Sequence, residues 1–246
     1  MRQGRFRALG VTWPDHPGPP NWHLDPSTNT TWPNDPYCFD ISYRYTPNRG
    51  DIKFVHELNR LQYLQPMAAA ALDDDDDLAA LVVQHLESWM SSNPPYRGMA
   101  WLSGIELALR VVSLLVVSTL IGAGAFSAEF RQRLQLCLAA HGYWLARFPS
   151  RFSSANNHRI AEAGGLYLLG CLVPSLRHAP QWRSEGRQAL ERELALQFHD
   201  DGVGAEQSPT YSAFSLEWCL LCATVGGQPS SRHHGSIGQP AAHRRR

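Results

Sequence analysis

Two polar segments combine residue types suited to acid–base catalysis and anion binding, and each lies where a helix is expected to begin. They are 156–158 (Asn-Asn-His) and, further along the chain, 208–211 (Ser-Pro-Thr-Tyr). Asparagine and serine are favoured helix caps, and proline is favoured at the first helical position. Asn157, His158 and Tyr211 would then lie beside free backbone N–H groups at the positive end of a helix dipole, which favours an anionic ligand.

Several charged and polar residues are candidates to support these segments. Asn156 and Glu206 adjoin them and are candidate substrate contacts. Glu162 follows His158 by four residues and shares its helix face, so it could orient the imidazole or simply be exposed.

Arg60 and Arg97 are further candidates for binding substrate. A guanidinium group can bind a carboxylate or a sulfate through two parallel hydrogen bonds. The alternative is that these arginines form structural ion pairs with Glu57 or Glu106.

The composition indicates a globular protein with no overall charge. The chain has 246 residues, 43% of them hydrophobic, and Lys plus Arg equals Asp plus Glu at 22 each. No net field attracts nucleic acid, so anion binding must be local. The five cysteines are scattered and fit core thiols, and the aspartates of 73–77 fit a helix N-terminus better than a calcium loop. We expect no metal site and no cofactor.

The sequence predicts neither export nor a membrane span. No apolar run follows the N-terminus, so the chain as written has no signal peptide and would be cytoplasmic. The uncharged run 111–126 is shorter than the about 20 residues that a span needs, which favours a buried helix. The sequence gives no indication of oligomeric state.

Hydrophobic periodicity predicts an all-α domain at 51–225 between an irregular N-terminal arm, 1–50, and a disordered tail, 226–246. No stretch alternates convincingly as a strand. The predicted helices are 51–71, 78–90, 101–120, 128–148, 157–172, 181–198 and 209–225. Short connections favour antiparallel neighbours, so the loops at 93–98, 154–158 and 206–211 should share one end and one cleft.

The sequence resembles the heparinase II/III family of polysaccharide lyases, roughly from residue 5 to 225. The motifs that carry the resemblance, in order, are 51–62 (DIKFVHELNRLQ), 93–98 (NPPYRG) with Trp101, Glu106 and Arg110, 156–158 (NNH) with Glu162, and 201–203 (DGV) with 206–211 (EQSPTY). One departure is Ser212, where the family commonly has histidine. The resemblance implies an incomplete α/α toroid of antiparallel helical hairpins that cleaves an acidic polysaccharide, such as heparan sulfate or alginate, by β-elimination.

Family members continue into more toroid and a C-terminal β-sandwich, and they are often periplasmic or secreted. Because periodicity is lost at Gly226, the resemblance predicts a truncated form with weak activity or none. Asn157 and His158 are suited to hold the uronate carboxylate. The resemblance makes Tyr211 the acid, with either Tyr211 or His158 as the base.

Two other functions remain open from the sequence. The chain could be a non-catalytic carbohydrate-binding helical domain. It could also be an α/α toroid glycoside hydrolase, which requires two carboxylates of acid and base type, drawn from Glu57, Glu162 and Glu206.

Overall fold

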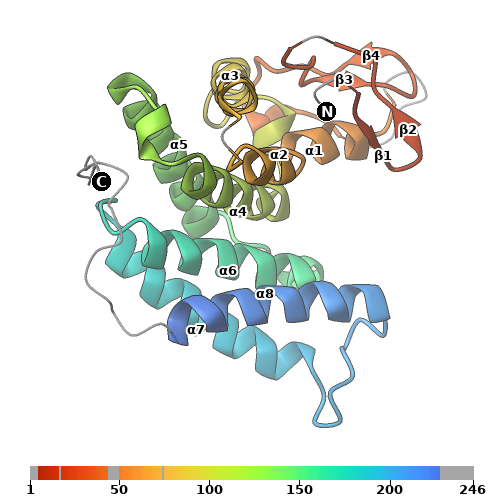
Figure 1. Ribbon diagram of the computed structural model, residues 1–246. Coiled ribbons are helices and arrows are strands. Elements are labelled where there is room, and N and C mark those ends of the chain that lie inside the picture. Colours follow the sequence, from red (N-terminus) through yellow and green to blue (C-terminus); the bar gives the residue numbers. More distant parts are fainter. Residues whose placement is uncertain (1–4, 17, 44–49, 74, 228–246) are drawn as a thin grey trace, which may run out of the picture. The chain divides into compact units, whose positions relative to one another are not determined.

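The computed structural model describes residues 5–16, 18–43, 50–73 and 75–227, which form mainly α-helices (Figure 1). The chain divides into two compact units. Unit 1 consists of Met1–Glu106 and Ser113–Phe130, and unit 2 of Leu107–Val112 and Arg131–Arg246. We describe each unit by itself.

Unit 1 begins with two small antiparallel hairpins and continues with helices. Its elements are β1 (Arg7–Ala8), β2 (Val11–Thr12), β3 (Leu24–Asp25), β4 (Thr30–Thr31), η1 (Cys38–Asp40), α1 (Ile52–Asn59), α2 (Leu64–Ala70), α3 (Asp76–Ser92), η2 (Met99–Trp101), η3 (Ala123–Ala125), both ends of α4 (Gly104–Ile121) and the start of α5 (Ala128–Arg147). Asp75 caps α3 by accepting from Leu78 N at 3.0 Å, as expected for the aspartate run.

The described part of the N-terminal arm contains two short hairpins that the sequence did not predict. Strand β1 pairs with β2 and β3 with β4, each over two residues. Leu9 and Gly10 between the first pair both have positive φ, the requirement of a tight hairpin turn. Tryptophans anchor the arm. Trp22 is buried and donates to Ser88 Oγ at 3.0 Å, and the Trp13 ring lies 4.7 Å from that of Phe6.

The prediction of one helix over 51–71 is wrong, because the chain breaks between α1 and α2. Leu61 adopts the left-handed conformation, with φ of 59°. In a continuous helix Pro66 would lack its hydrogen bond and clash with the preceding turn, whereas in α2 it lies in the first turn, where no N–H is needed. Asn59, at the end of α1, donates to Trp22 O at 2.7 Å and so joins the helix to the arm.

Unit 2 is built around α6 (Asn157–Leu172), α7 (Ala179–Gln197) and α8 (Pro209–Gly227), preceded by most of α5 and the short η4 (Phe152–Ser154). Helix α6 packs against both α7 and α8 (Figure 1). Gln197 at the end of α7 contacts Asn156 at the start of α6, so these two helices are antiparallel. By contrast, Glu206, just before α8, contacts Asn157, so α6 and α8 begin at the same end.

The predicted helix 157–172 coincides with α6. The predicted bounds that correspond to α3, α4, α5, α7 and α8 differ from the observed ones by a few residues. Gly226 and Gly227 belong to α8, whereas 228–246, the rest of the predicted tail, lie outside the described residues. The division into arm, helical domain and tail stays a prediction.

Helices α6 and α7 approach so closely that only glycine fits at the contact. A Cβ added to Gly170 would lie 2.3 Å from Arg183 N, and one added to Gly186 would lie 2.6 Å from Tyr167 N. Both obstacles are backbone atoms, which cannot rotate away. We therefore expect Gly170→Ala to separate the helices despite alanine's higher helix propensity.

The expected cost of Gly170→Ala is about 1–3 kcal/mol of unfolding free energy, since overpacked interfaces lose that much. Thermal unfolding followed by circular dichroism would show a lower midpoint. The matched control is Gly124→Ala, where an added Cβ meets nothing within 4 Å. Equal midpoints for the two variants would contradict this interpretation.

One helix, α4, is long and apolar enough to cross a membrane by length and composition, with a mean hydropathy of 2.0. However, 61% of that helix is buried within the protein. The buried core helix of a protein also meets these length and hydropathy criteria, so they are weak evidence for a membrane span. The burial of α4 is consistent with the expectation of a buried helix.

The five cysteines are free thiols, and Cys38, Cys137 and Cys222 are buried, as predicted for core residues. Burial raises the pKa of Cys137 to about 12 and that of Cys222 to about 12. The thiols of Cys171 and Cys219 also have a raised pKa, mainly because of burial.

Candidate functional site

The backbone N–H groups in the first turn of α6 donate hydrogen bonds to the cap residue and to a carboxylate that is distant in the sequence. Asn156 is the cap, and its Oδ1 accepts from His158 N at 3.1 Å. Glu206 Oε1 accepts from Asn157 N at 2.8 Å. Arg159 N donates to Asn156 O at 2.9 Å. The expectation of free N–H groups at this helix start is therefore wrong, because Glu206 already occupies the place of an anion.

Glu206 also holds the side chain of Asn157. Its Oε2 accepts from Asn157 Nδ2 at 3.1 Å, so one carboxylate binds both the backbone and the amide of the same asparagine. Asn157 is buried and Glu206 is half-buried. The other Nδ2 hydrogen and the amide oxygen of Asn157 take no part in these two bonds. Glu206 therefore orients the amide, which can still donate one hydrogen bond and accept others.

Glu162 fixes the loop that leads into α6. Its two carboxylate oxygens accept from Ser150 N at 2.7 Å and Ser150 Oγ at 2.6 Å, and Arg159 Nη1 lies 3.8 Å from Oε2. The residue is 1% exposed, so the alternative that Glu162 is a solvated side chain is wrong. Burial raises the pKa of Glu162, while the Ser150 hydrogen bonds and the charge of Arg159 oppose that shift. Its role in orienting His158 stays a prediction.

Gln197 is a positioning residue that the sequence analysis missed. From the last position of α7, its Nε2 donates to Asn156 O at 2.9 Å and lies 3.4 Å from Ala155 O. It also donates to Glu193 Oε2 at 3.2 Å. A glutamine near a helix end gives no sequence signal of this role, because the contact depends on how α7 packs against α6.

Tyr211 lies in the first turn of α8, at the same end of unit 2 as Asn157 and His158. Its N–H lies 3.5 Å from Ser208 Oγ, at the long limit of a hydrogen bond, consistent with the predicted cap. The side chain is 50% exposed. Gln207, which precedes the cap, has φ of 52°, and such left-handed backbone is often found at functional turns. That these three residues open onto one cleft stays a prediction.

In unit 1, Arg60 is engaged by two carboxylates. Arg60 Nε and Nη2 donate to Glu106 at 2.7 and 2.9 Å, and Nη1 donates to Glu57 at 2.6 Å. Burial alone would lower the pKa of Arg60, but the hydrogen bonds and charges of the two glutamates outweigh it and raise the pKa. These contacts are the structural ion pairs weighed as the alternative to substrate binding, and Arg60 forms both of them.

Arg97 instead secures the N-terminal arm. Its Nη1 donates to the backbone oxygen of Asp35 at 2.6 Å, and its backbone bridges to Tyr37. It is exposed, so a role toward substrate stays a prediction, as does the shared end expected for the 93–98 loop.

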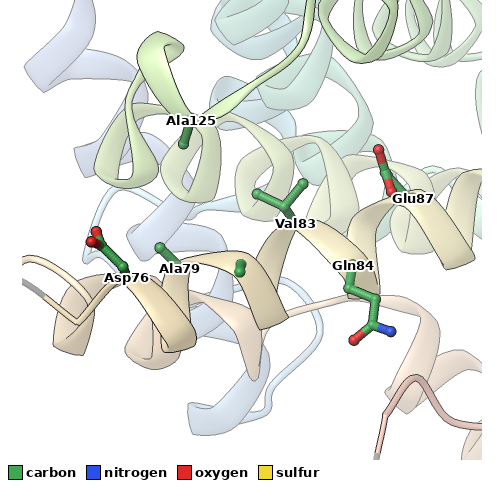
Figure 2. Close-up of a pocket in the computed structure, with 7 residues that line it drawn as sticks. Asp76, Ala79, Val83, Gln84, Glu87 and Ala125 are labelled. Atoms are coloured by element: carbon green, nitrogen blue, oxygen red, sulfur yellow. The ribbon is translucent and has the colours of Figure 1, made fainter.

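A shallow pocket of about 320 Å³ in unit 1 does not involve the candidate residues. Figure 2 shows Asp76 and Glu87 on the α3 side of this pocket, with Ala125 opposite. Two carboxylates and small apolar side chains do not suit an acidic ligand. Within the described part of the chain, no group of three or more metal-ligating side chains could hold a metal ion.

The comparisons of this chain with known proteins agree with one another. The model of the heparinase II/III N-terminus family matches residues 24–228. A heparin-sulfate lyase of Bacteroides stercoris is 25% identical over 211 residues, which cover 77% of this chain and 31% of that protein.

Two solved structures are similar to the fold. The heparan sulfate lyase HepC from Pedobacter heparinus is 24% identical with a TM-score of 0.60, covering 76% of this chain and 30% of that one. Heparinase III, the BT4657 gene product, is 22% identical with a TM-score of 0.61, covering 78% and 33%. The chain thus spans about a third of the length of these relatives. This likeness shows the fold and confirms the predicted all-α class.

Proposed function

The chain belongs to the heparinase II/III family, and from that premise we propose that it carries the site of a polysaccharide lyase that cleaves a uronate polymer by β-elimination. Heparan sulfate is the first candidate substrate and alginate the second. The B. stercoris relative is a heparin-sulfate lyase, which supports this order.

The observation that carries the proposal is the pair of hydrogen bonds that Asn157 donates to Glu206. It joins the loop before α8 to the start of α6 and so brings the Asn-His pair and Tyr211 to one end of unit 2. Elimination requires a group that holds the carboxylate, a base that accepts the C5 proton and an acid that donates a proton to O4. All of these groups must face the same sugar. Asn157, His158 and Tyr211 offer these group types.

β-Elimination removes the proton from C5 of the uronate and breaks the C4–O4 bond, leaving a C4–C5 double bond and a protonated O4 on the departing sugar. We assign carboxylate binding to the amide of Asn157 with the ring of His158, since the helix N–H groups are already bonded. Hydrogen bonds to the carboxylate stabilise charge as the C5 proton leaves. Tyr211 donates the proton to O4, and either Tyr211 or His158 accepts the C5 proton. Asn156, as the cap, positions this turn.

The purified chain is expected to produce unsaturated, ultraviolet-absorbing oligosaccharides from heparan sulfate, at the weak rate that the resemblance predicts, and more slowly still from alginate. Absorbance of the C4–C5 unsaturated product measures this directly. Polymer binding without product would favour the non-catalytic carbohydrate-binding alternative. Cleavage with new reducing ends but no absorbance would favour a glycoside hydrolase.

The hydrolase alternative is weaker, since its candidate carboxylates have other partners. Both oxygens of Glu162 bind Ser150, and both oxygens of Glu206 bind Asn157. Glu57 binds Arg60. A hydrolase requires two carboxyl groups that are free to reach the sugar, one as acid and one as base, and the contacts of these three side chains engage them elsewhere.

A further inference from the structure

The loop before α6 presents an aromatic ring almost fully to solvent. Phe152 is 93% exposed, and among the described large hydrophobic side chains the next most exposed is Leu196 at 66%. Single exposed hydrophobic residues are ordinary. Phe152 is unusual because its backbone also has φ of 56°, a conformation that residues other than glycine rarely adopt.

Hydrogen bonds on both sides hold this strained segment in place. Before Phe152, Ser150 donates twice to the buried Glu162. After it, Ala155 N donates to Phe152 O at 3.0 Å, and Gln197 holds the carbonyl of Asn156. Strain that surrounding contacts maintain is typical of ligand-binding turns. The contacts fix where the ring is presented, while the ring itself packs on little of the protein.

The surroundings of the loop carry positive charge. Arg151 precedes Phe152, and Arg159 lies one turn into α6. Burial lowers the pKa of Arg159, and the charges of Arg192 and Arg151 add to this shift. Two of these arginines are paired, since Arg159 Nη1 lies 3.8 Å from Glu162 Oε2 and Arg192 Nη2 donates to Glu193 Oε1 at 3.1 Å, so the exposed Arg151 carries the net positive charge. Glu162 and Glu193 oppose the shift. Such a mixture of an aromatic face and arginines suits an acidic sugar, whose ring offers C–H faces and whose substituents carry negative charge.

We propose that Phe152 is a stacking platform for one pyranose ring of an acidic oligosaccharide whose neighbouring uronate binds at Asn157. This inference rests on the proposed function and adds a subsite to it. Phe152 precedes Asn157 by five residues, which span at most about 18 Å when extended and less through the 3₁₀ turn. One oligosaccharide can therefore reach both residues, with the uronate at Asn157 and its neighbouring pyranose on Phe152.

The test is calorimetric binding of a heparan sulfate hexasaccharide and of glucuronate alone, in a Tyr211→Phe background so that the oligosaccharide is not cleaved. Phe152→Ala should weaken hexasaccharide binding about 3- to 10-fold, the range expected for loss of one aromatic stacking contact. Phe152→Trp should bind like the parent, because it keeps a stacking face. Binding of glucuronate alone should be the same in all variants.

Two controls separate stacking from folding. Phe152→Gly removes the ring but readily adopts a positive φ, so it should bind as weakly as the alanine variant while unfolding at the same or a higher temperature. Leu172→Ala removes an exposed apolar side chain at the opposite end of α6 and should leave binding unchanged.

Several outcomes would overturn the platform. One is hexasaccharide binding by Phe152→Ala equal to that of the parent, and another is weak binding by Phe152→Trp. If Phe152→Ala changes self-association in sedimentation but not sugar binding, the ring contacts protein instead. If the parent protein and Phe152→Ala bind the hexasaccharide equally well, only the platform is overturned and the lyase proposal stands. If the parent protein binds no uronate oligosaccharide, both the platform and the lyase proposal are overturned.

Discussion

Replacing Tyr211 with phenylalanine is expected to lower the turnover of the uronate polymer by about 10²–10⁴-fold, the usual contribution of one proton-transfer group. The ring and its position in the first turn of α8 are retained, and only the hydroxyl is lost. Polymer binding should therefore change little, so the loss should appear in kcat and not in KM. Initial rates of ultraviolet-absorbing product formation over a range of substrate concentrations measure both constants.

Tyr143→Phe is the matched control for this experiment. Tyr143 lies on α5 within unit 2 and is 47% exposed, close to the value for Tyr211, but its ring packs against His178 and Trp182. This variant should keep full turnover. If Tyr211→Phe also keeps it, His158 becomes the proton-transfer candidate, and His158→Gln should then abolish the reaction.

Replacing Arg60 with methionine should lower the unfolding free energy by about 3–5 kcal/mol, the usual cost of removing one partner of a buried ion pair. Glu106 is 5% exposed and would lose both hydrogen bonds from the guanidinium. Urea unfolding followed by far-ultraviolet circular dichroism measures the change. The double variant Arg60→Met with Glu106→Leu should recover part of the loss, because it removes the buried Glu106 carboxylate, whereas Glu57, whose side chain is 21% exposed, stays hydrated.

Arg187→Met provides the comparison for Arg60. Its Nε lies 2.7 Å from Glu191 Oε1, the same separation as Arg60 Nε from Glu106 Oε2, but the Arg187 side chain is 70% exposed. Water screens this surface pair, so we expect no measurable change. Equal effects of the two variants would show that burial is not what makes the Arg60 pair important.

Local sequence patterns predicted α6 well because its start depends on nearby residues. Asn156 is a strong cap, and the apolar positions that follow keep helical spacing to Leu172. The break between α1 and α2 was missed because periodicity continues across Leu61, which adopts a positive φ although it is an apolar, fully buried residue. Two-residue strands such as β1 and β2 are too short to produce an alternating pattern.

Long-range contacts explain what the sequence could not reveal about the site. It identified Asn157 and Glu206 as candidates, but not that they bind each other, since 49 positions separate them and the contact requires parallel packing of α6 and α8. It placed an anion site at the helix N–H groups, which Glu206 occupies. It also overlooked Ser150 and Gln197, whose residue types are common in loops and at helix ends.

The state of the thiols has a practical consequence for labelling chemistry. Alkylating reagents react with the thiolate, and burial keeps Cys137 and Cys222 protonated at neutral pH. Cys38 is fully buried, and the raised pKa values of Cys171 and Cys219 also slow their reaction. A cysteine introduced at an exposed position such as Phe152 would therefore react with maleimide much faster than the native thiols. A fluorophore could be attached beside the Asn156 turn without first removing any of the five cysteines.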